Sequence, residues 1–273
     1  MMICSTGKRC DLPAGLRLFR RFEFPHKLGI VEKLYGRHLE QYGVSWVETS
    51  TGLAWKLDLG NPTHRWIVYG MYEGSGFLNW AREFLPHDGV VVDSGANIGQ
   101  MLLYLATYVP DGKVLAFEPH KEAMDWLKEC LAVNAELPVQ CIQMGLSESP
   151  GDMFLLSPGP ENLHGAWSQI SDLEGKPVHV VRLQDYLDNR GIDTVHLWKL
   201  DVEGHEMQAL HGAERYLVNG AIRAIYAELG FGNGPRIRTY LESFGYKCYL
   251  FDRHGNLCPS KELPVHINAI FLM

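Results

Sequence analysis

From residue 76 onward, short strand-like runs alternate with helix-like segments, and this alternation limits the folds open to the chain. Strand-like runs lie at 90–93, 113–118, 139–144, 195–200 and 222–229, and helical patterns lie at 98–108, 121–136, 205–217 and 237–244. Strands joined by helices form right-handed βαβ units, which place the strands parallel in one sheet. Two final runs, 246–251 and 266–272, are separated by a turn at 254–256 and no helix, so they must pair antiparallel. The sequence therefore predicts an α/β fold.

The first 75 residues have a different pattern. Residues 16–39 are mostly helical in character, and the runs 46–49 and 53–59 flank Ser50-Thr51-Gly52, a hairpin signal. This part shows no pattern for a closed core of its own. We therefore expect a helical and hairpin extension over residues 1–75, packed on a main domain over residues 76–273.

Composition excludes several classes of function. The net charge is −7, and no stretch gathers enough lysine and arginine for a nucleic-acid surface. Arg17, Arg20 and Arg21 are interleaved with apolar residues, which favours one face of a helix over a binding patch. The six cysteines form no C-x-x-C pair, and no apolar run reaches the roughly 18 residues of a membrane span. With no apolar signal region at the N-terminus, we expect a cytoplasmic protein with free thiols.

Residues 90–100, VVVDSGANIGQ, place an acid and two glycines at the end of the first strand of the α/β region. In an open parallel sheet, ligands bind outside the carboxyl ends of the strands. Gly95 and Gly99 allow the backbone to approach a ligand closely. The spacing G-x-x-x-G differs from the dinucleotide pattern G-x-G-x-x-G. Asp93 would repel a pyrophosphate but attract an ammonium or sulfonium group.

A second acid follows the next strand. Glu118 lies 19 residues after Gly99 and can accept hydrogen bonds from both hydroxyls of a ribose. Together, Asp93 and Glu118 fit a nucleoside with a cationic amino-acid tail, which is the shape of S-adenosylmethionine. The alternative is a helix-capping role for Asp93 and a solvent-facing Glu118.

Four polar residues follow two further strands. Asp201, Glu203 and His205 come directly after the run 195–200, and Glu228 ends the run 222–229. We expect them to converge on one rim, with His205 as the general base because its ordinary pKa is near 6.5. Glu228 would orient the base or the acceptor, and Asp201 would lie beside the cationic end of the cofactor. Alternatives are a first-turn role for Glu203, a capping role for His205, or a carboxylate base. We expect no metal.

The three blocks VVVDSGANIGQ, VLAFEPH and HLWKLDVEGHEMQALHGAERYL resemble the FkbM family of S-adenosylmethionine-dependent methyltransferases. The resemblance covers about residues 70–230, with Ser94 and Gln184 as small departures. It implies a Rossmann-like class I methyltransferase fold with a seven-stranded, mostly parallel sheet and an antiparallel terminal strand. It also implies methyl transfer, typically to a hydroxyl of a sugar or natural product. The expected cofactor-binding residues are Glu73, Asp93, Gly95, Ala96, Asn97, Gly99, Glu118, Pro119, Gly145, Leu146 and Asp201.

Residues 145–182 interrupt the α/β rhythm with many glycines and prolines. Two strand-like runs, 153–156 and 178–182, flank a long loop, and long loops in compact domains are usually functional. We expect Asn162, His164 and Trp167 to contact the small-molecule acceptor. The rival hypotheses are a nicotinamide-dependent oxidoreductase, which the glycine spacing disfavours, and a cofactor-binding scaffold without catalysis. A homo-oligomer is left open.

Overall fold

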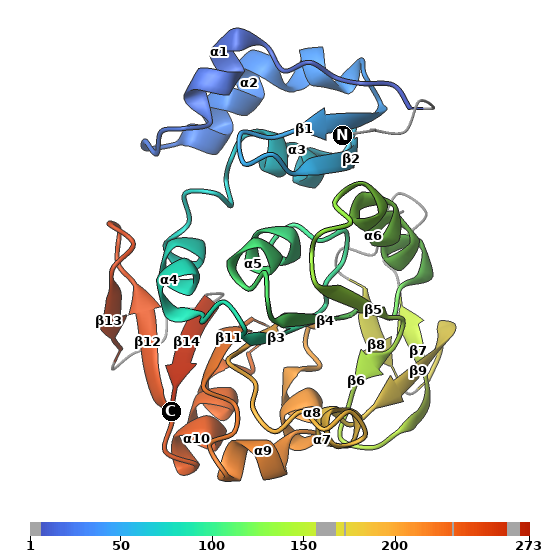
Figure 1. Ribbon diagram of the computed structural model, residues 1–273, viewed down its shortest axis with the longest axis vertical. Coiled ribbons are helices and arrows are strands. Elements are labelled where there is room, and N and C mark those ends of the chain that lie inside the picture. The colour runs from blue at the N-terminus through green and yellow to red at the C-terminus, as the bar shows by residue number, and fades with distance from the viewer. Residues whose placement is uncertain (1–6, 157–167, 172, 231, 261–267) are drawn as a thin grey trace.

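An eight-stranded sheet forms the centre of the main domain (Figure 1). The computed structural model describes residues 7–156, 168–171, 173–230, 232–260 and 268–273. The strands are, in spatial order, β13 (Leu257–Pro259), β12 (Lys247–Phe251), β14 (Asn268–Leu272), β11 (Ala224–Glu228), β10 (Leu197–Leu200), β3 (Val90–Ser94), β4 (Lys113–Phe117) and β5 (Val139–Ile142). The five from β11 to β5 run parallel, whereas β14 is antiparallel to both β11 and β12. The α/β class and the antiparallel terminal strand are confirmed.

The turn at residues 254–256 joins different strands from those predicted. It connects β12 to β13, a short edge strand that the sequence pattern did not reveal, and not to β14. The Asp252 carboxylate holds the turn by accepting the backbone N–H groups of His254 at 2.7 Å and Asn256 at 2.9 Å. The seven expected strands are all present, and β13 is an eighth.

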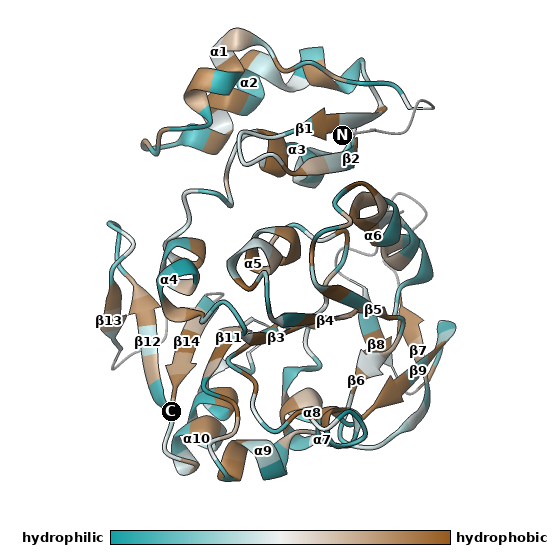
Figure 2. Ribbon diagram, in the orientation of Figure 1, coloured by the Kyte–Doolittle hydropathy of each residue, from teal (hydrophilic) through white to brown (hydrophobic). Residues whose placement is uncertain are grey.

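Helices cover both faces of the main sheet (Figure 1). One face carries α4 (Gly76–Phe84), α5 (Leu102–Tyr108) and α6 (Lys121–Val133), and the other carries α7 (Leu183–Asp188), α8 (Glu206–His211), α9 (Glu214–Val218) and α10 (Gly234–Ser243). The central strands are therefore buried along nearly their whole length, and Figure 2 shows hydrophobic residues concentrated on them. Among the residues described, no helix has both the length and the apolar character that crossing a bilayer requires.

The single helix predicted over residues 205–217 is two helices, α8 and α9. The break falls at Gly212, where an added Cβ would lie 2.1 Å from the carbonyl oxygen of Ser147. The glycine therefore permits a close approach between the α8–α9 connection and the chain after β5. A periodicity argument cannot detect this contact, because it depends on the tertiary packing.

The strand order reverses between β3 and β10. From β3 the chain proceeds through β4 to β5 at one edge, and from β10 it proceeds to β11 in the opposite direction. In register, Asp93 of β3 is opposite Lys199 of β10. Ligands of open α/β sheets bind at such a reversal, outside the carboxyl ends of the strands.

Residues 145–181 form a second sheet of four strands at the side of the main domain. Its spatial order is β6 (Gly145–Leu146), β9 (Lys176–Val181), β7 (Gly151–Leu156) and β8 (Gln169–Ser171). The predicted runs 153–156 and 178–182 correspond to β7 and β9. Because β6 begins three residues after β5 ends, this sheet starts at the ligand-binding edge of the main sheet.

The N-terminal part contains α1 (Ala14–Phe19), α2 (Lys27–Glu40), the antiparallel hairpin of β1 (Val44–Glu48) and β2 (Ala54–Asp58), and α3 (Pro62–Val68). The predicted hairpin is confirmed. The ring of Trp55 lies 5.6 Å from the ring of Tyr104 in α5, within one shared hydrophobic cluster. The Asn134 side chain bonds both the N–H and the C=O of Ala54. The division at residue 75 stays a prediction.

Candidate active site

A cavity of about 250 Å³ lies at the carboxyl ends of β3, β4, β10 and β11. Eleven of the residues proposed from the sequence line it: Asp93, Gly95, Ala96, Asn97, Glu118, Pro119, Gly145, Leu146, Asp201, Glu203 and Glu228. As expected, these residues therefore lie together at one edge of the sheet. Their individual roles stay proposals.

Glu118 is held in place by the backbone on both sides. Its Oε2 accepts the N–H of Asn97 and its Oε1 accepts the N–H of His120, each at 2.8 Å. Burial raises the pKa of Glu118 to about 7, although these two hydrogen bonds lower it. Each carboxylate oxygen keeps a further lone pair, so Glu118 can still accept hydroxyl groups from a ligand in the cavity.

Asp93, Lys199 and Asp201 form a charged chain across β3 and β10. The Lys199 ammonium lies 3.1 Å from a carboxylate oxygen of each acid. Burial lowers the pKa of Lys199, but the carboxylates of Asp201 and Asp93 raise it overall. Burial raises the pKa of Asp93, which is 1% exposed. Lys199 therefore pairs with two acids of the site.

Gly95 lines the cavity and is also required by a backbone contact, which the sequence did not predict. Its φ is +76°, and an added Cβ would lie 1.8 Å from the carbonyl oxygen of Asp201. Two other cavity residues, Asn97 and Glu203, also have left-handed backbones, with φ of +49° and +53°. Backbone strain of this kind is typical of ligand-binding turns.

The Gly95→Ala substitution should therefore destabilise the fold itself. We expect a loss of unfolding free energy of about 2–5 kcal/mol, the sum of a left-handed alanine and an overpacked contact. Gly232→Ala is the matched control, because Gly232 has a φ of +75° with nothing within 4 Å of the added Cβ. It should lose only about 1–2 kcal/mol. Urea unfolding measures both values, and equal losses would contradict the close contact with Asp201.

Two of the proposed cofactor residues do not reach the cavity. A Cβ at Gly99 would meet the side chains of Leu103 at 2.5 Å and Leu127 at 2.8 Å, so this glycine serves packing between α5 and α6. Glu73 instead forms an ion pair with buried Arg20 and accepts the hydroxyl of Tyr104 at 3.1 Å. Its carboxylate anchors the N-terminal helices to the main domain, which corrects the predicted role of Glu73.

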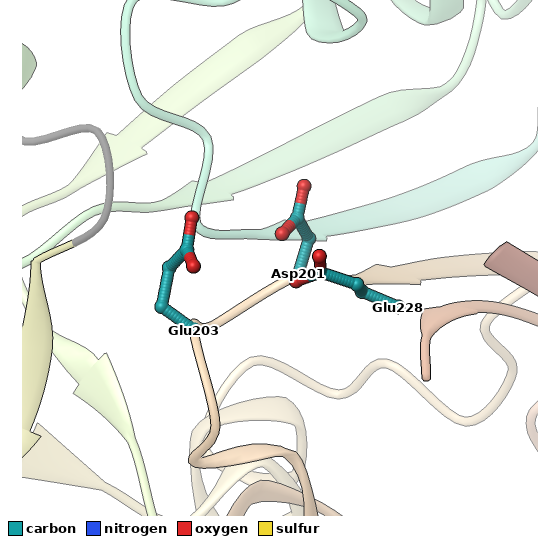
Figure 3. Close-up of side chains that lie close together, drawn as sticks. All are labelled: Asp201, Glu203 and Glu228. Carbon is teal, nitrogen blue, oxygen red and sulfur yellow. The ribbon is translucent and has the colours of Figure 1, made fainter. Parts of the chain in front are cut away.

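Three carboxylates gather on the rim of the cavity (Figure 3). Asp201 and Glu203 follow β10, Glu228 ends β11, and one oxygen of each lies within 4.8 Å of the others. Burial, followed by the charges of Asp201 and Glu203, raises the pKa of Glu228 to about 8. Glu228 therefore holds a proton near neutral pH and can exchange it within this cluster.

Asp201 and Glu203 alone are too close in sequence to indicate a metal triad. Glu228 supplies the third carboxylate from another strand, so that reason for excluding a metal does not hold. Metal independence stays a prediction, which an activity assay with and without EDTA tests.

His205 does not face the cavity. Its side chain is buried, and its Nε2 lies 3.0 Å from Oγ of Ser147. The residue does not belong to the cavity lining, whereas the three carboxylates do. The role of His205 as the base stays a prediction, and the carboxylates are the alternative base that the sequence analysis also allowed.

One side of the cavity is lined by residues that were not predicted from the sequence. Thr63 and Trp66 of α3, together with Tyr72, line the cavity from the N-terminal part of the chain, and Ser168 and Ile170 line it from β8 and its start. The predicted acceptor residues Asn162, His164 and Trp167 lie outside the described residues.

Comparisons with known proteins identify the family of the chain. Residues 93–248, more than half of the chain, match the model of the methyltransferase FkbM domain. The methyltransferase sdnD of Sordaria araneosa is 31% identical over 196 residues, covering 59% of this chain and 75% of that protein. The hexuronic acid methyltransferase AglP of Haloferax volcanii is 25% identical over 193 residues, covering 71% of this chain and 77% of that protein.

Among solved structures, the human methyltransferase 10 domain containing protein superposes with a TM-score of 0.47 and 11% identity, covering 89% of this chain and 94% of that one. At this TM-score the superposition adds nothing to the fold assignment, which rests on the strand order described above. The family match and the curated relatives decide the identity. The chain therefore belongs to the FkbM methyltransferase family, is a methyltransferase, and takes S-adenosylmethionine as its methyl donor.

Proposed function

We propose that this methyltransferase acts on a hydroxyl group of a sugar or natural-product small molecule. The carboxylate cluster of Asp201, Glu203 and Glu228 carries the proposal. A hydroxyl nucleophile loses its proton as it attacks, and a base positioned at the cavity rim accelerates that step by about 10²–10⁴-fold. Glu228 is our candidate for the base, since its raised pKa makes it a stronger base than an ordinary carboxylate.

The acids deeper in the cavity suit the methyl donor. Glu118 would accept the ribose hydroxyls, and Asp93 and Asp201 would face the cationic end, with Lys199 bridging the two acids. When bound, the donor supplies a methyl group on a sulfonium centre. The residues around it align the acceptor oxygen and exclude water, which is the main contribution of a protein to such a transfer.

The N-terminal wall suits a ring-shaped acceptor. Trp66 is half-buried and offers a flat apolar face on which a sugar or another ring can lie. Burial raises the pKa of Tyr72 to about 12, so its hydroxyl remains a hydrogen-bond donor at neutral pH. An aromatic face, a hydroxyl donor and carboxylate acceptors together match the groups of a polyhydroxylated acceptor.

The experiment that tests this function has two steps. Calorimetric titration with S-adenosylhomocysteine and then with NAD separates the methyltransferase from the oxidoreductase hypothesis. Incubation with S-adenosylmethionine and a glycan and metabolite library, read by mass spectrometry, then identifies the methylated acceptor. Cofactor binding without transfer to any acceptor would favour the non-catalytic scaffold.

The charge of the cavity predicts which sugars are accepted. Among the described lining residues, five are acids (Asp93, Glu118, Asp201, Glu203 and Glu228), and Lys199 is the one cation. An acceptor carboxylate would be repelled, so we expect a neutral sugar to have at least about a tenfold higher kcat/KM than the matched uronic acid. A preference for the uronic acid, such as the name of AglP describes, would contradict this charge argument while leaving the methyl transfer intact.

A further inference from the structure

The outer side of the N-terminal helices exposes large apolar side chains. Leu18 is 58% exposed, Phe22 57%, Ile30 43% and Leu34 58%. Four of the ten large apolar residues exposed in the described part of the chain thus fall within 17 consecutive positions. Figure 1 shows that α1 and α2 lie at the end of the molecule farthest from the main sheet. We call these four side chains, with the exposed cations between them, the α1–α2 surface.

The folding of the two helices does not require these four residues. α2 turns Val31 and Leu39 inward, and α1 turns Leu16 inward. Ile30 and Leu34 are one turn apart on the solvent side of α2. Leu18 lies near the end of α1, and Phe22 lies in the connection between α1 and α2. Apolar groups that are gathered in this way on the outside of a protein mark an interaction site.

The same surface is basic, although the chain as a whole carries a net charge of −7. Residues 14–40 contain six lysines and arginines and three glutamates. The three acids also reach solvent, but each pairs with a buried cation: Glu23 with Lys27, and Glu32 and Glu40 with Arg65. The cations left facing solvent are Arg17, Arg21, Lys33 and Arg37. Figure 2 shows the resulting mixture of hydrophobic and hydrophilic residues on α1 and α2.

A groove beside α1 adds to this charge. Arg9, Arg17, Arg20 and Arg21 line it, together with the acids Asp11 and Glu48. The acids form only long pairs there, at 3.9 Å to Arg17 and 3.7 Å to Arg9. Glu73 balances the charge of Arg20, and Glu48 and Asp11 balance Arg9 and Arg17, so exposed Arg21 leaves the groove with an excess positive charge that favours an anionic group.

We propose that the α1–α2 surface docks on an anionic phospholipid bilayer. Apolar side chains that alternate with cations on a helix face insert between lipid headgroups while the cations contact lipid phosphates. The arginine groove would take one such headgroup. The inference does not depend on the identity of the methyl acceptor, because the cavity and the α1–α2 surface share no apolar residue.

The experiment is co-sedimentation of the full chain with large vesicles. We expect at least tenfold more binding to phosphatidylcholine vesicles containing 30% phosphatidylglycerol than to pure phosphatidylcholine, and a decrease as salt is added. Arg21→Glu with Arg37→Glu, and separately Phe22→Ser with Leu34→Ser, should each lower binding at least tenfold. Because all four residues are exposed, the melting temperature and the affinity for S-adenosylhomocysteine should stay unchanged.

Matched controls lie elsewhere on the surface. Val218→Ser removes an apolar residue that is 56% exposed on α9, and Lys128→Glu reverses an exposed charge on α6. Equal losses in these controls, or no binding to the anionic vesicles, would overturn the proposal. If a low concentration of soluble glycerophosphoglycerol released all of the protein from the vesicles, the groove would bind the anion without insertion of the apolar side chains into the bilayer. That result would also contradict the proposal. A dimer that Phe22→Ser dissociates, seen by light scattering, would show that a second copy covers the surface.

Discussion

Glu118→Ala should weaken the binding of S-adenosylhomocysteine by at least about 100-fold. The carboxylate is 7% exposed, faces the cavity and is fixed by two backbone N–H groups, so it is already oriented before a ligand arrives. Hydrogen bonds to a charged group contribute about 1.5–3 kcal/mol each, and two ribose hydroxyls would donate to it. Calorimetry with S-adenosylhomocysteine measures the loss without any need for an acceptor.

The matched control is Glu73→Gln. The resemblance to the family placed both glutamates in the cofactor site, but the structure pairs Glu73 with Arg20. This substitution should lower the melting temperature and leave the cofactor affinity within about twofold, because an ion pair between elements is lost and no cavity group changes. If the two variants lost the same affinity for S-adenosylhomocysteine, the claim that Glu118 binds the ribose hydroxyls would be contradicted.

The raised pKa of Glu118 predicts that both the stability of the protein and its affinity for the cofactor depend on pH. Its folded value of about 7 exceeds the ordinary value of 4.5, so the folded state binds a proton that the unfolded state has released. Stability of the empty protein should therefore fall as pH rises between about 4.5 and 7. Cofactor affinity should change in the opposite sense, rising as pH passes 7, because the carboxylate accepts hydroxyls better than the protonated acid does. Glu118→Ala should lose both dependences.

The sequence was sufficient to predict the main sheet because each central strand combines a buried apolar run with an acid or glycine at its carboxyl end. Asp93, Glu118, Asp201 and Glu228 all lie where parallel strands end, and the strand order brings them together. The βαβ rule makes these strands parallel, but the strand order that brings the acids together was taken from the family that the chain resembles.

The features that were missed depend on tertiary contacts. Gly95 and Gly212 are glycines because other backbone segments approach them, which no local pattern records. Glu73 faces Arg20 across 53 residues of sequence. Trp66 reaches the cavity because a helix of the N-terminal part packs beside the main domain. Such pairings become visible only when the elements are placed in space.

His205 shows the limit of positional arguments for catalysis. Its place after β10 and its ordinary pKa made it the natural base, but side-chain direction decides what a residue contacts. Glu203, two residues earlier, has a φ of +53°, and this turn sends its carboxylate to the rim while the imidazole is directed toward Ser147. The carboxylates that line the cavity are therefore our candidates for the base.

Glu228→Gln should lower kcat by about 10²–10⁴-fold and remove the rising limb of the pH–rate profile. The limb arises because Glu228, with a pKa of about 8, must release its proton before it can accept one from the acceptor hydroxyl. In the wild-type protein, kcat/KM should therefore rise with pH up to about 8. A bound cationic donor favours the carboxylate and would move this midpoint lower. The measurement is the initial rate of S-adenosylhomocysteine release from pH 5.5 to 9.

His205→Gln is the matched comparison, because glutamine can keep a hydrogen bond to Ser147 but cannot titrate. If Glu228 is the base, this variant should keep the pH limb and lose little turnover. If His205→Gln removed the limb while Glu228→Gln retained it, the imidazole would be the base and would have to leave Ser147 when the acceptor binds. In either variant the affinity for S-adenosylhomocysteine should change by less than about threefold, since neither side chain is assigned to the donor. A lost rate with intact cofactor binding thus identifies the group that takes the proton.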